Sequence, residues 1–164
     1  MAAIEAESGA NRALVSYYFG GKAGLVAALV DGVFQDPGTG LVETIRDEAE
    51  GPARTQRLLD WQERVSAHDR VNRQLYELLP QALRDPAVRQ RFADEYRLYR
   101  RIDAECLDAA PADLDDAEAL AAVTIAVVEG LAIQRALDPD GFDHARAWRA
   151  WRAVIDGYLR LSQG

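Results

Sequence analysis

The sequence predicts an all-α fold, and three observations support this prediction. Apolar residues recur at steps of three and four along almost the whole chain, as they do on one face of an amphipathic helix. No stretch alternates apolar and polar residues between turn signals in the way that a half-buried strand does. The breaks between apolar stretches consist of Gly, Pro, Asn and Asp, which are typical of helix ends and turns. At 164 residues the chain can bury a sizeable core, as one domain or as one domain with a small appendage.

Composition and charge limit the class of protein. The formal net charge of −8 argues against a surface that binds nucleic acid everywhere, but it is compatible with a local binding patch. The single Cys106 cannot form an internal disulfide, which suits a reducing cytoplasm. The first residues show no secretory signal, and the longest nearly apolar stretch, residues 117–128, ends at Glu129 and is too short to cross a bilayer. We therefore expect a soluble cytoplasmic protein with no membrane partner.

The N-terminal residues contain two very short predicted helices, residues 2–8 and 12–18. Isolated helices of this length are marginal in water, so each must pack on its neighbours. The tight turn between them, Gly9-Ala10-Asn11, gives the arrangement of a helix-turn-helix, with Asn11 as N-cap of the second helix. The predicted apolar core of this unit consists of Ile4, Ala6, Val15 and Phe19. The outer side of the second helix then carries Arg12, Ala13, Ser16 and Tyr17.

The remaining predicted helices are separated by turn sequences. A helix at residues 21–35 follows a pair of glycines, and a weak helix at 40–49 follows a turn rich in Pro and Gly. Five longer helices are predicted at residues 53–68, 70–84, 86–109, 113–137 and 142–161. The fourth of these is apolar nearly all round, so we expect it to be buried on every side, whereas the fifth has one broad apolar face.

Two stretches resemble a known family. Residues 4–29, IEAESGANRALVSYYFGGKAGLVAAL, are similar to the DNA-binding segment of TetR-family transcriptional regulators, and the part SYYFGGKAGL is similar to the BetI-like branch. Residues 127–148, VVEGLAIQRALDPDGFDHARAW, resemble the C-terminal domain of that branch. The resemblance implies a TetR-like fold, with a helix-turn-helix DNA-binding domain and connecting helix at 1–36 and a larger antiparallel helical domain for ligand binding and dimerisation at 37–164.

The resemblance also implies roles for the residues around the glycine hinge. In this family the tyrosine and lysine at the positions of Tyr17 and Lys22 contact DNA phosphates, and the phenylalanine at Phe19 fills the small core. A phenol hydroxyl and an ammonium group at one helix end are suited to holding phosphates, and Tyr18 is expected to pack. Base contacts fall by matching position to Arg12, Ala13, Leu14 and Ser16, beside the capping Asn11. The alternative is that the aromatic residues are only core and that Lys22 is a solvated cap.

One departure from the family concerns the N-terminus. Family members have a whole helix before the one that holds Ile4, so we expect this chain to begin inside the second helix and to lack the first. Residues 1–36 carry two basic and four acidic side chains, a net charge of −2. Two explanations stay open: the sequence is truncated, for example by a misplaced start codon, or this form binds DNA poorly.

The last two helices are candidates for a dimer interface. The resemblance implies that they pack against their twofold mates as a four-helix bundle, and a helix-turn-helix protein that binds palindromic half-sites requires a dimer for geometric reasons. The candidate interface residues are Val123, Val127, Gly130, Leu131, Trp148, Trp151, Ile155 and Tyr158. The alternative is that these residues form a monomer's own core.

A ligand pocket is expected among the helices at 53–68, 70–84 and 86–109, with part of 113–137 as a further wall. Aromatic residues with polar tips suit such a site. The candidate lining residues are Trp61, Tyr76, Phe92, Tyr96, Tyr99 and Gln134. The BetI-like resemblance implies an aromatic cage for a quaternary ammonium, and the alternative is that these aromatics are ordinary core.

Other patterns argue against an enzyme. His68 and His144 lie far apart and lack metal-ligand spacing, and Cys106 stands among acidic residues that raise the pKa of a thiol. The stretch 96–105 mixes basic and aromatic residues, but acidic neighbours including Asp103 neutralise it, so we interpret it as a solvated helix face. No catalytic motif, phosphate-binding motif, metal site or cofactor is predicted.

The sequence therefore predicts a dimeric, ligand-responsive transcriptional repressor. Its partners would be a palindromic operator DNA, a small-molecule effector of unidentified structure and a second copy of the chain. Ligand binding would change the separation of the two DNA-binding domains through the helix at 21–35. The alternative function is a ligand-binding or scaffolding dimer that cannot hold DNA because its first helix is missing.

Overall fold

The computed structural model describes residues 12–34, 51–107 and 114–161, and these residues form helices and turns without any strand. The all-α prediction is therefore confirmed for the described part of the chain. The helices are α2 (Arg12–Phe19), α3 (Lys22–Phe34), α5 (Pro52–Ser66), α6 (Asp69–Ala82), α7 (Pro86–Leu107), α8 (Leu114–Leu137) and α9 (His144–Leu161). The helices predicted at residues 2–8 and 40–49, the capping role of Asn11 and the domain boundary after residue 36 lie outside the described residues.

The observed helices begin and end within two residues of their predicted bounds, because capping residues and prolines fix the starts. Pro52 begins α5 at the position where a missing N–H costs nothing. The Asp85 carboxylate accepts a hydrogen bond from Ala87 N at 2.9 Å and so caps α7. Asp143 does the same for α9 by accepting from Arg146 N at 2.9 Å.

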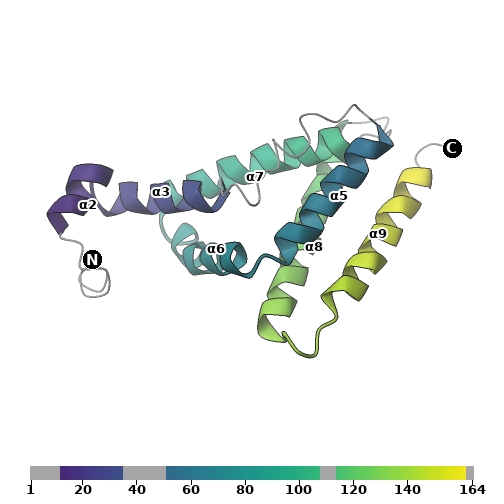
Figure 1. Ribbon diagram of the computed structural model, residues 1–164. Helices are drawn as coiled ribbons and strands as arrows, with labels where there is room; N and C mark the ends of the chain where they lie inside the picture. The colour runs from purple at the N-terminus through teal and green to yellow at the C-terminus, as the bar shows by residue number, and fades with distance from the viewer. Residues whose placement is uncertain (1–11, 35–50, 108–113, 162–164) are drawn as a thin grey trace.

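The long helix α7 joins the two ends of the molecule. Figure 1 shows α2 and α9 at opposite ends, with α3 beside the first part of α7 and with α5 and α8 at its far end. Near α3, an apolar cluster combines Val26, Val30, Ala82, Val88 and Phe92. At the other end, a second cluster combines Leu58, Leu59, Trp61, Cys106, Leu107 and Ile155. Helix α3 therefore packs directly on α7 and α6.

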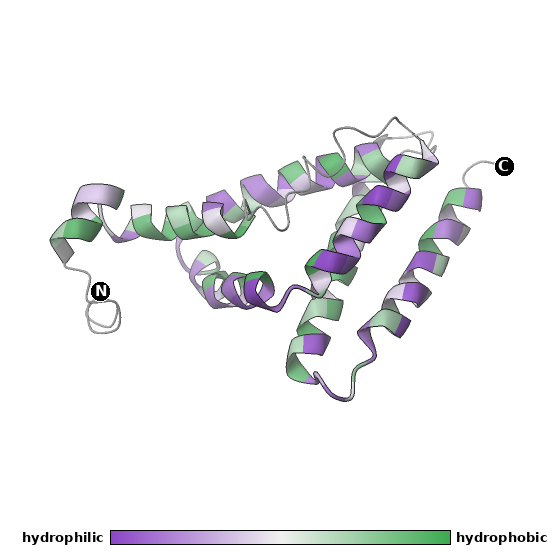
Figure 2. Cartoon of the chain, in the orientation of Figure 1, coloured by the Kyte–Doolittle hydropathy of each residue, from purple (hydrophilic) through white to green (hydrophobic). Residues whose placement is uncertain are grey.

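Helix α8 is buried along one stripe and open along another. The buried stripe consists of Ala117, Ala121, Thr124, Val128 and Ala132, whereas Val123 is 53% and Ile133 41% exposed. The prediction that this helix is buried on every side is wrong for the single chain. Small residues let α7 approach on one side, and the larger side chains point outward. Figure 2 shows the predominantly apolar character of α8.

The apolar stretch of α8 is longer than the sequence reading allowed. By length and composition Ala117–Leu137 could cross a bilayer, with a mean hydropathy of 1.6. The sequence-based expectation considered residues 117–128 alone, and by length and composition it is wrong for the longer stretch Ala117–Leu137. Within the described residues it packs against α5, α6, α7 and α9, with 28% of the apolar stretch buried.

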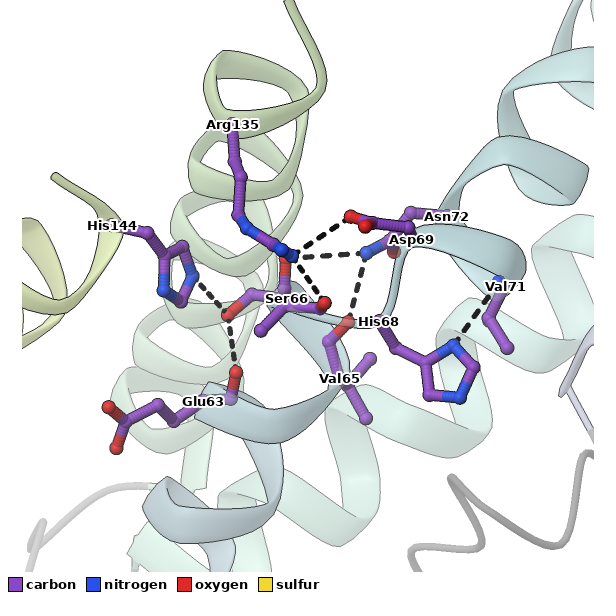
Figure 3. Close-up of polar contacts among 10 residues, drawn as sticks. Glu63, Val65, Ser66, His68, Asp69, Val71, Asn72, Arg135 and His144 are labelled. Carbon is purple, nitrogen blue, oxygen red and sulfur yellow. Dashed lines mark hydrogen bonds and ion pairs between the residues drawn. The ribbon is translucent and has the colours of Figure 1, made fainter. Parts of the chain in front are cut away.

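A polar cluster holds the turn between α5 and α6 against α8 and α9 (Figure 3). Ser66 Oγ lies 2.9 Å from both Glu63 O and His144 Nε2, which ties the start of α9 to the end of α5. Arg135 of α8 donates to Ala67 O and, at 2.9 Å, to Asp69 Oδ1. These bonds fix the corner from which α5 and α6 diverge.

Candidate functional site

The corner between α2 and α3 is made by three glycines. The two helices meet at a bend of 61°. Gly20 and Gly21 have φ angles of 67° and 119°, which lie in the region that favours glycine. A Cβ atom on Gly24 would stand 1.7 Å from Phe19 O, so only glycine fits there without a shift of the backbone. The sequence FGGKAG therefore specifies a tight corner that fixes the direction of α2 relative to α3.

The predicted DNA-contacting residues of α2 and α3 lie on an exposed surface. Val15 is buried against α3, while Leu14 is 50% and Tyr17 81% exposed. The other exposed members of the predicted set are Ala13, Ser16 and Lys22. Arg12 begins α2, but its side chain lies outside the described residues, as does Asn11. Contact of these residues with DNA stays a prediction.

Two aromatic residues of this corner differ from their predicted placement. Tyr18 is 71% and Phe19 40% exposed, although both were expected to pack or to fill the core. The Tyr18 ring contacts Tyr17 edge to face at a centroid distance of 5.0 Å. Among the described helices α3 is the main packing partner of α2, and its small residues at this point offer little apolar surface to either ring.

The molecule has a mostly apolar cavity of about 90 Å³, partly open to solvent, between α3, α5, α6, α7 and α8. Three predicted ligand-binding residues, Trp61, Tyr96 and Tyr99, meet in its wall. The full lining is Val33, Phe34, Trp61, Gln62, Val65, Val71, Asn72, Leu75, Tyr96, Tyr99, Asp103, Ile125, Val128 and Glu129. The cavity thus lies among the helices that the sequence indicated, with α3 as an additional wall.

Three other predicted lining residues lie elsewhere. Phe92 is buried behind Phe34, with ring centroids 5.6 Å apart, and does not line the cavity. Tyr76 lines separate surface grooves between α6 and α8. Gln134 is exposed and donates to Gly130 O at 3.3 Å within its own helix. The structure therefore gives these three no common site with Trp61, Tyr96 and Tyr99.

The aromatic wall connects the cavity to the end of α3. The Trp61 and Tyr99 rings stack with centroids 5.9 Å apart and an interplanar angle of 16°. Phe34 lies against Tyr99 at 5.8 Å and against Tyr96 at 6.2 Å. The Tyr99 hydroxyl donates to Phe34 O at 3.1 Å, so a side chain of α7 holds the last residue of α3.

A buried carboxyl group belongs to the lining of the cavity. Asp103 is 1% exposed, and Gln62 Nε2 donates to its Oδ2 at 2.8 Å. Burial away from water disfavours the carboxylate and raises the pKa of Asp103 to about 8, although the hydrogen bond from Gln62 opposes this. Near neutral pH the empty cavity therefore keeps most of this group protonated.

A second carboxyl group belongs to Glu129 of α8. Tyr96 OH donates to Glu129 Oε1, and burial is the main cause of the raised pKa of Glu129. Burial and the neighbouring Glu129 likewise raise the pKa of the Tyr96 hydroxyl, so it stays a neutral donor. The cavity thus combines aromatic walls with two acidic groups.

Sequence reasoning missed Asp103 and Phe34 as cavity residues. Asp103 was assigned to a solvated helix face, and this assignment is wrong because the residue is buried. Its spacing from Tyr96 and Tyr99, at steps of three and four, places all three on one helix face and was the signal that could have found it. Phe34 carried no such signal, because its role depends on packing between α3 and α7.

The predicted dimer residues fall into two groups. Val123 is 53% and Tyr158 39% exposed, and the half-buried residues are Val127, Gly130, Leu131 and Trp151. Trp148 and Ile155 are fully buried within the chain itself, so they support the surface from beneath as parts of its own core. Dimer contact at these positions stays a prediction.

Comparison with known protein families gives one match. A family model described as BetI-type transcriptional repressor, C-terminal, matches residues 51–160. The matched residues contain α5 to α9 and therefore every wall of the cavity except the one that α3 provides. Neither the curated proteins nor the solved structures gave a match.

Proposed function

Because the chain belongs to the TetR family of transcriptional regulators, with the C-terminal domain of the BetI-type repressors, we propose that it is a ligand-responsive repressor that binds a palindromic operator as a homodimer. The observation that carries this proposal is the placement of the cavity. Its wall includes Val33 and Phe34 at the end of α3, and α3 leads directly into the exposed helix α2. An effector and an operator would therefore act on the two ends of one helix.

The exposed side of α2 is the proposed DNA-contacting surface. The phenol of Tyr17 and the ammonium group of Lys22 would bind phosphates and fix the register of α2. The base contacts would come from Arg12, Ala13, Leu14 and Ser16, near the N-terminus of a recognition helix in the major groove. Since the chain has a net charge of −8, these few contacts must act locally.

The effector would act by displacing the end of α3. In the structure Tyr99 OH donates to Phe34 O, and Arg91 forms an ion pair of 3.2 Å with Asp31 of α3. A ligand that enters beside Phe34 and favours another position of α3 would change the direction of α2 and the spacing of the two DNA-binding helices in the dimer. By linkage, the operator would weaken effector binding by the same factor.

The proposed dimer interface uses the open stripe of α8 and the outer face of α9. Both helices carry large apolar side chains that are exposed in the single chain. Exposed apolar residues that lie together often mark an interface. They are Val123, Ile133, Leu137, Val154, Tyr158 and Leu161. A twofold contact would bury them against the same surface of a second copy. We assign this regulator to the cytoplasm, where its operator lies.

A second candidate function is a ligand-binding or scaffolding dimer that does not bind DNA. The exposure of Tyr18 and Phe19 favours it, because within the described residues the corner of α2 and α3 lacks the apolar partner that would cover these rings. The cavity and the dimer surface serve this function equally well.

Fluorescence anisotropy with the DNA that flanks the gene tests the proposal. The experiment compares this chain, a version extended into the upstream reading frame, and the variants Lys22→Ala and Arg101→Ala over a salt series. Lys22→Ala should weaken binding and make the slope of log K against log salt shallower by about 0.9, the value for one phosphate contact. Arg101→Ala removes an equal charge from an exposed site on α7 and should leave the slope unchanged.

If neither chain length binds this DNA above random DNA at low salt, the DNA-binding function is wrong and the second candidate stands. If both variants change the slope equally, the contact is not localised at α2.

A further inference from the structure

In the cavity wall, several polar groups already donate hydrogen bonds within the protein, whereas two acceptor atoms accept none. Tyr99 OH donates to Phe34 O, and Tyr96 OH donates to Glu129. Asn72 Nδ2 donates to Val65 O at 2.9 Å and Ser66 O at 3.3 Å, and Gln62 Nε2 donates to Asp103. These donors are thus engaged inside the protein, so a ligand that needs donors from the wall would find them occupied.

Two acceptor atoms of lining residues form no hydrogen bond within the described residues. Asp103 Oδ1 and Gln62 Oε1 are buried and accept no hydrogen bond within the described part of the chain. Both residues line the cavity, and each is 1% exposed. A buried acceptor without a donor destabilises the folded protein. A ligand that supplies N–H groups at this point would recover that free energy.

The charge of the wall selects a cation over an anion. The lining contains the acidic groups of Asp103 and Glu129, and its described residues include no Lys or Arg. The stacked Trp61 and Tyr99 rings offer aromatic surface that attracts cations and covers an apolar body. An anionic ligand would find no positively charged partner in the described lining, and burying its charge without one disfavours binding.

We propose that the effector is a small ammonium compound with at least one N–H group and an apolar body. Its N–H groups donate to Asp103 Oδ1 and Gln62 Oε1, while its apolar body lies against Trp61 and Tyr99. A quaternary ammonium satisfies the charge but leaves both oxygen atoms without a donor. This inference rests on the proposed ligand-responsive function and names the chemical class of its ligand.

Ion pairing in this site displaces a proton. Because burial raises the pKa of Asp103 to about 8, the empty site holds a proton near pH 7 that the bound ammonium group replaces. Tyr99 and Cys106, which interact electrostatically with Asp103, have pKa values raised by burial and stay neutral there, and the Arg54 guanidinium of α5 acts on Cys106. Glu129 and Tyr96, also in the lining, share a hydrogen bond with each other. Binding should therefore release up to one proton.

Isothermal titration calorimetry with two matched series tests the proposal. The probes are butylamine, butyltrimethylammonium, butanol and butyrate, and the corresponding benzyl compounds, each titrated at pH 7 in two buffers of different ionisation enthalpy. At least one amine should bind about ten-fold or more tightly than its trimethylated and alcohol analogues, since a hydrogen bond to a charged group is worth about 1.5–3 kcal/mol. The buffer dependence should show proton release.

Asp103→Asn keeps the shape of the side chain and removes its charge. It should lower amine affinity about ten-fold or more and abolish proton release. Asp94→Asn changes an exposed carboxylate on the same helix and should do neither. A urea unfolding curve for each variant verifies that it is folded, and the comparison among probes on the unmodified chain needs no variant.

Three results would overturn the proposal. If the alcohol binds as tightly as the amine, the proposed ion pair is wrong. If the trimethylated cation binds as tightly as the amine or more tightly, the proposed requirement for an N–H group is wrong. Failure of both amines to bind at about 10 mM, roughly ten-fold above a weak dissociation constant of 1 mM, would exclude an ammonium effector of this size. None of these measurements involves DNA. The anisotropy experiment tests operator binding separately.

Discussion

At the scale of single residues, Asp103 is the most unusual group in the molecule. A carboxyl group that is 1% exposed and has one donor, Gln62, is held in its neutral form by burial. Such an arrangement lowers the stability of the empty protein whenever the group must ionise. We interpret this destabilisation as a consequence of a site that is suited to binding a cation.

The pKa of Asp103 predicts how the free energy of unfolding changes with pH. The pKa is about 8 in the folded chain and near its ordinary value of 3.8 when unfolded, so folding favours the protonated form. The resulting stabilisation is complete below about pH 4 and is lost as pH rises toward about 8. Asp103→Asn should therefore remove a dependence of at most about 1.4 kcal/mol per pH unit.

Urea unfolding of both proteins at pH 5.5 and pH 8 checks this prediction. The variant should gain stability relative to the parent chain as pH rises. Glu129 also has a raised pKa but is unchanged in the variant, so its contribution cancels. Equal pH dependence in the two proteins would show that Asp103 is not held neutral by its surroundings.

Residue patterns predicted only part of the cavity, for physical reasons. Trp61, Tyr96 and Tyr99 could be predicted because large amphipathic side chains on facing helices favour an interior site. Asp103 was misread because its neighbours are charged, and charge in the sequence does not tell which helix face is buried. Phe34 depends on contacts between α3 and α7 that are remote in sequence.

At the scale of elements, the corner between α2 and α3 controls the direction of the proposed DNA-contacting helix. Gly24 is the closest point of approach, because a Cβ there would stand 1.7 Å from Phe19 O. Gly32 lies in the same helix with open space around its Cα. The two glycines therefore form a matched pair that separates the effect of close packing from that of helix propensity.

Gly24→Ala should force α2 away from α3. Overpacking of this kind costs about 1–3 kcal/mol, and so short a helix cannot hold its shape without packing. Amide hydrogen exchange in residues 12–19 should become faster in Gly24→Ala. It should stay unchanged in Gly32→Ala, where the new methyl group favours the helix by up to about 1 kcal/mol. The same exchange rate in both variants would contradict the close contact.

Among the properties of the helices, their first and last residues were predicted best from the sequence. Each described helix begins or ends at a residue whose chemistry is local, such as Pro52, Asp85 or Asp143. Burial was predicted less well, as α8 shows. Its composition demanded an apolar environment on every side, but one stripe remains open in the single chain because no other described helix covers it.

At the scale of the whole molecule, the open stripe of α8 predicts the oligomeric state. Val123 is 53% exposed in the single chain, so Val123→Glu should leave the fold intact while placing a charge in the proposed twofold interface. Sedimentation equilibrium should show a dimer for the parent chain and a shift to monomer for this variant. Leu29→Glu changes an apolar residue of α3 that is 49% exposed, outside the proposed interface, and should remain dimeric. A monomeric parent chain would exclude the proposed interface.

The fold connects its two proposed sites through one helix. The α3 helix meets the cavity at Phe34 and turns into α2 through Gly20 and Gly21. Because α7 and α6 pack along α3, the C-terminal domain of the BetI-type family and the exposed corner of α2 form one continuous unit. This connection is the central claim of the account.

Measuring operator affinity with and without a saturating amine tests that claim most directly, using fluorescence anisotropy for DNA and calorimetry for the amine on the same protein. We predict that the amine weakens DNA binding by about five-fold or more, and that DNA weakens amine binding by the same factor, as linkage requires. Tyr99→Phe, which removes the hydrogen bond to Phe34 O, should change this factor without abolishing either binding event. If neither ligand changes the affinity for the other, the proposed connection between the cavity and the DNA-contacting helix is wrong.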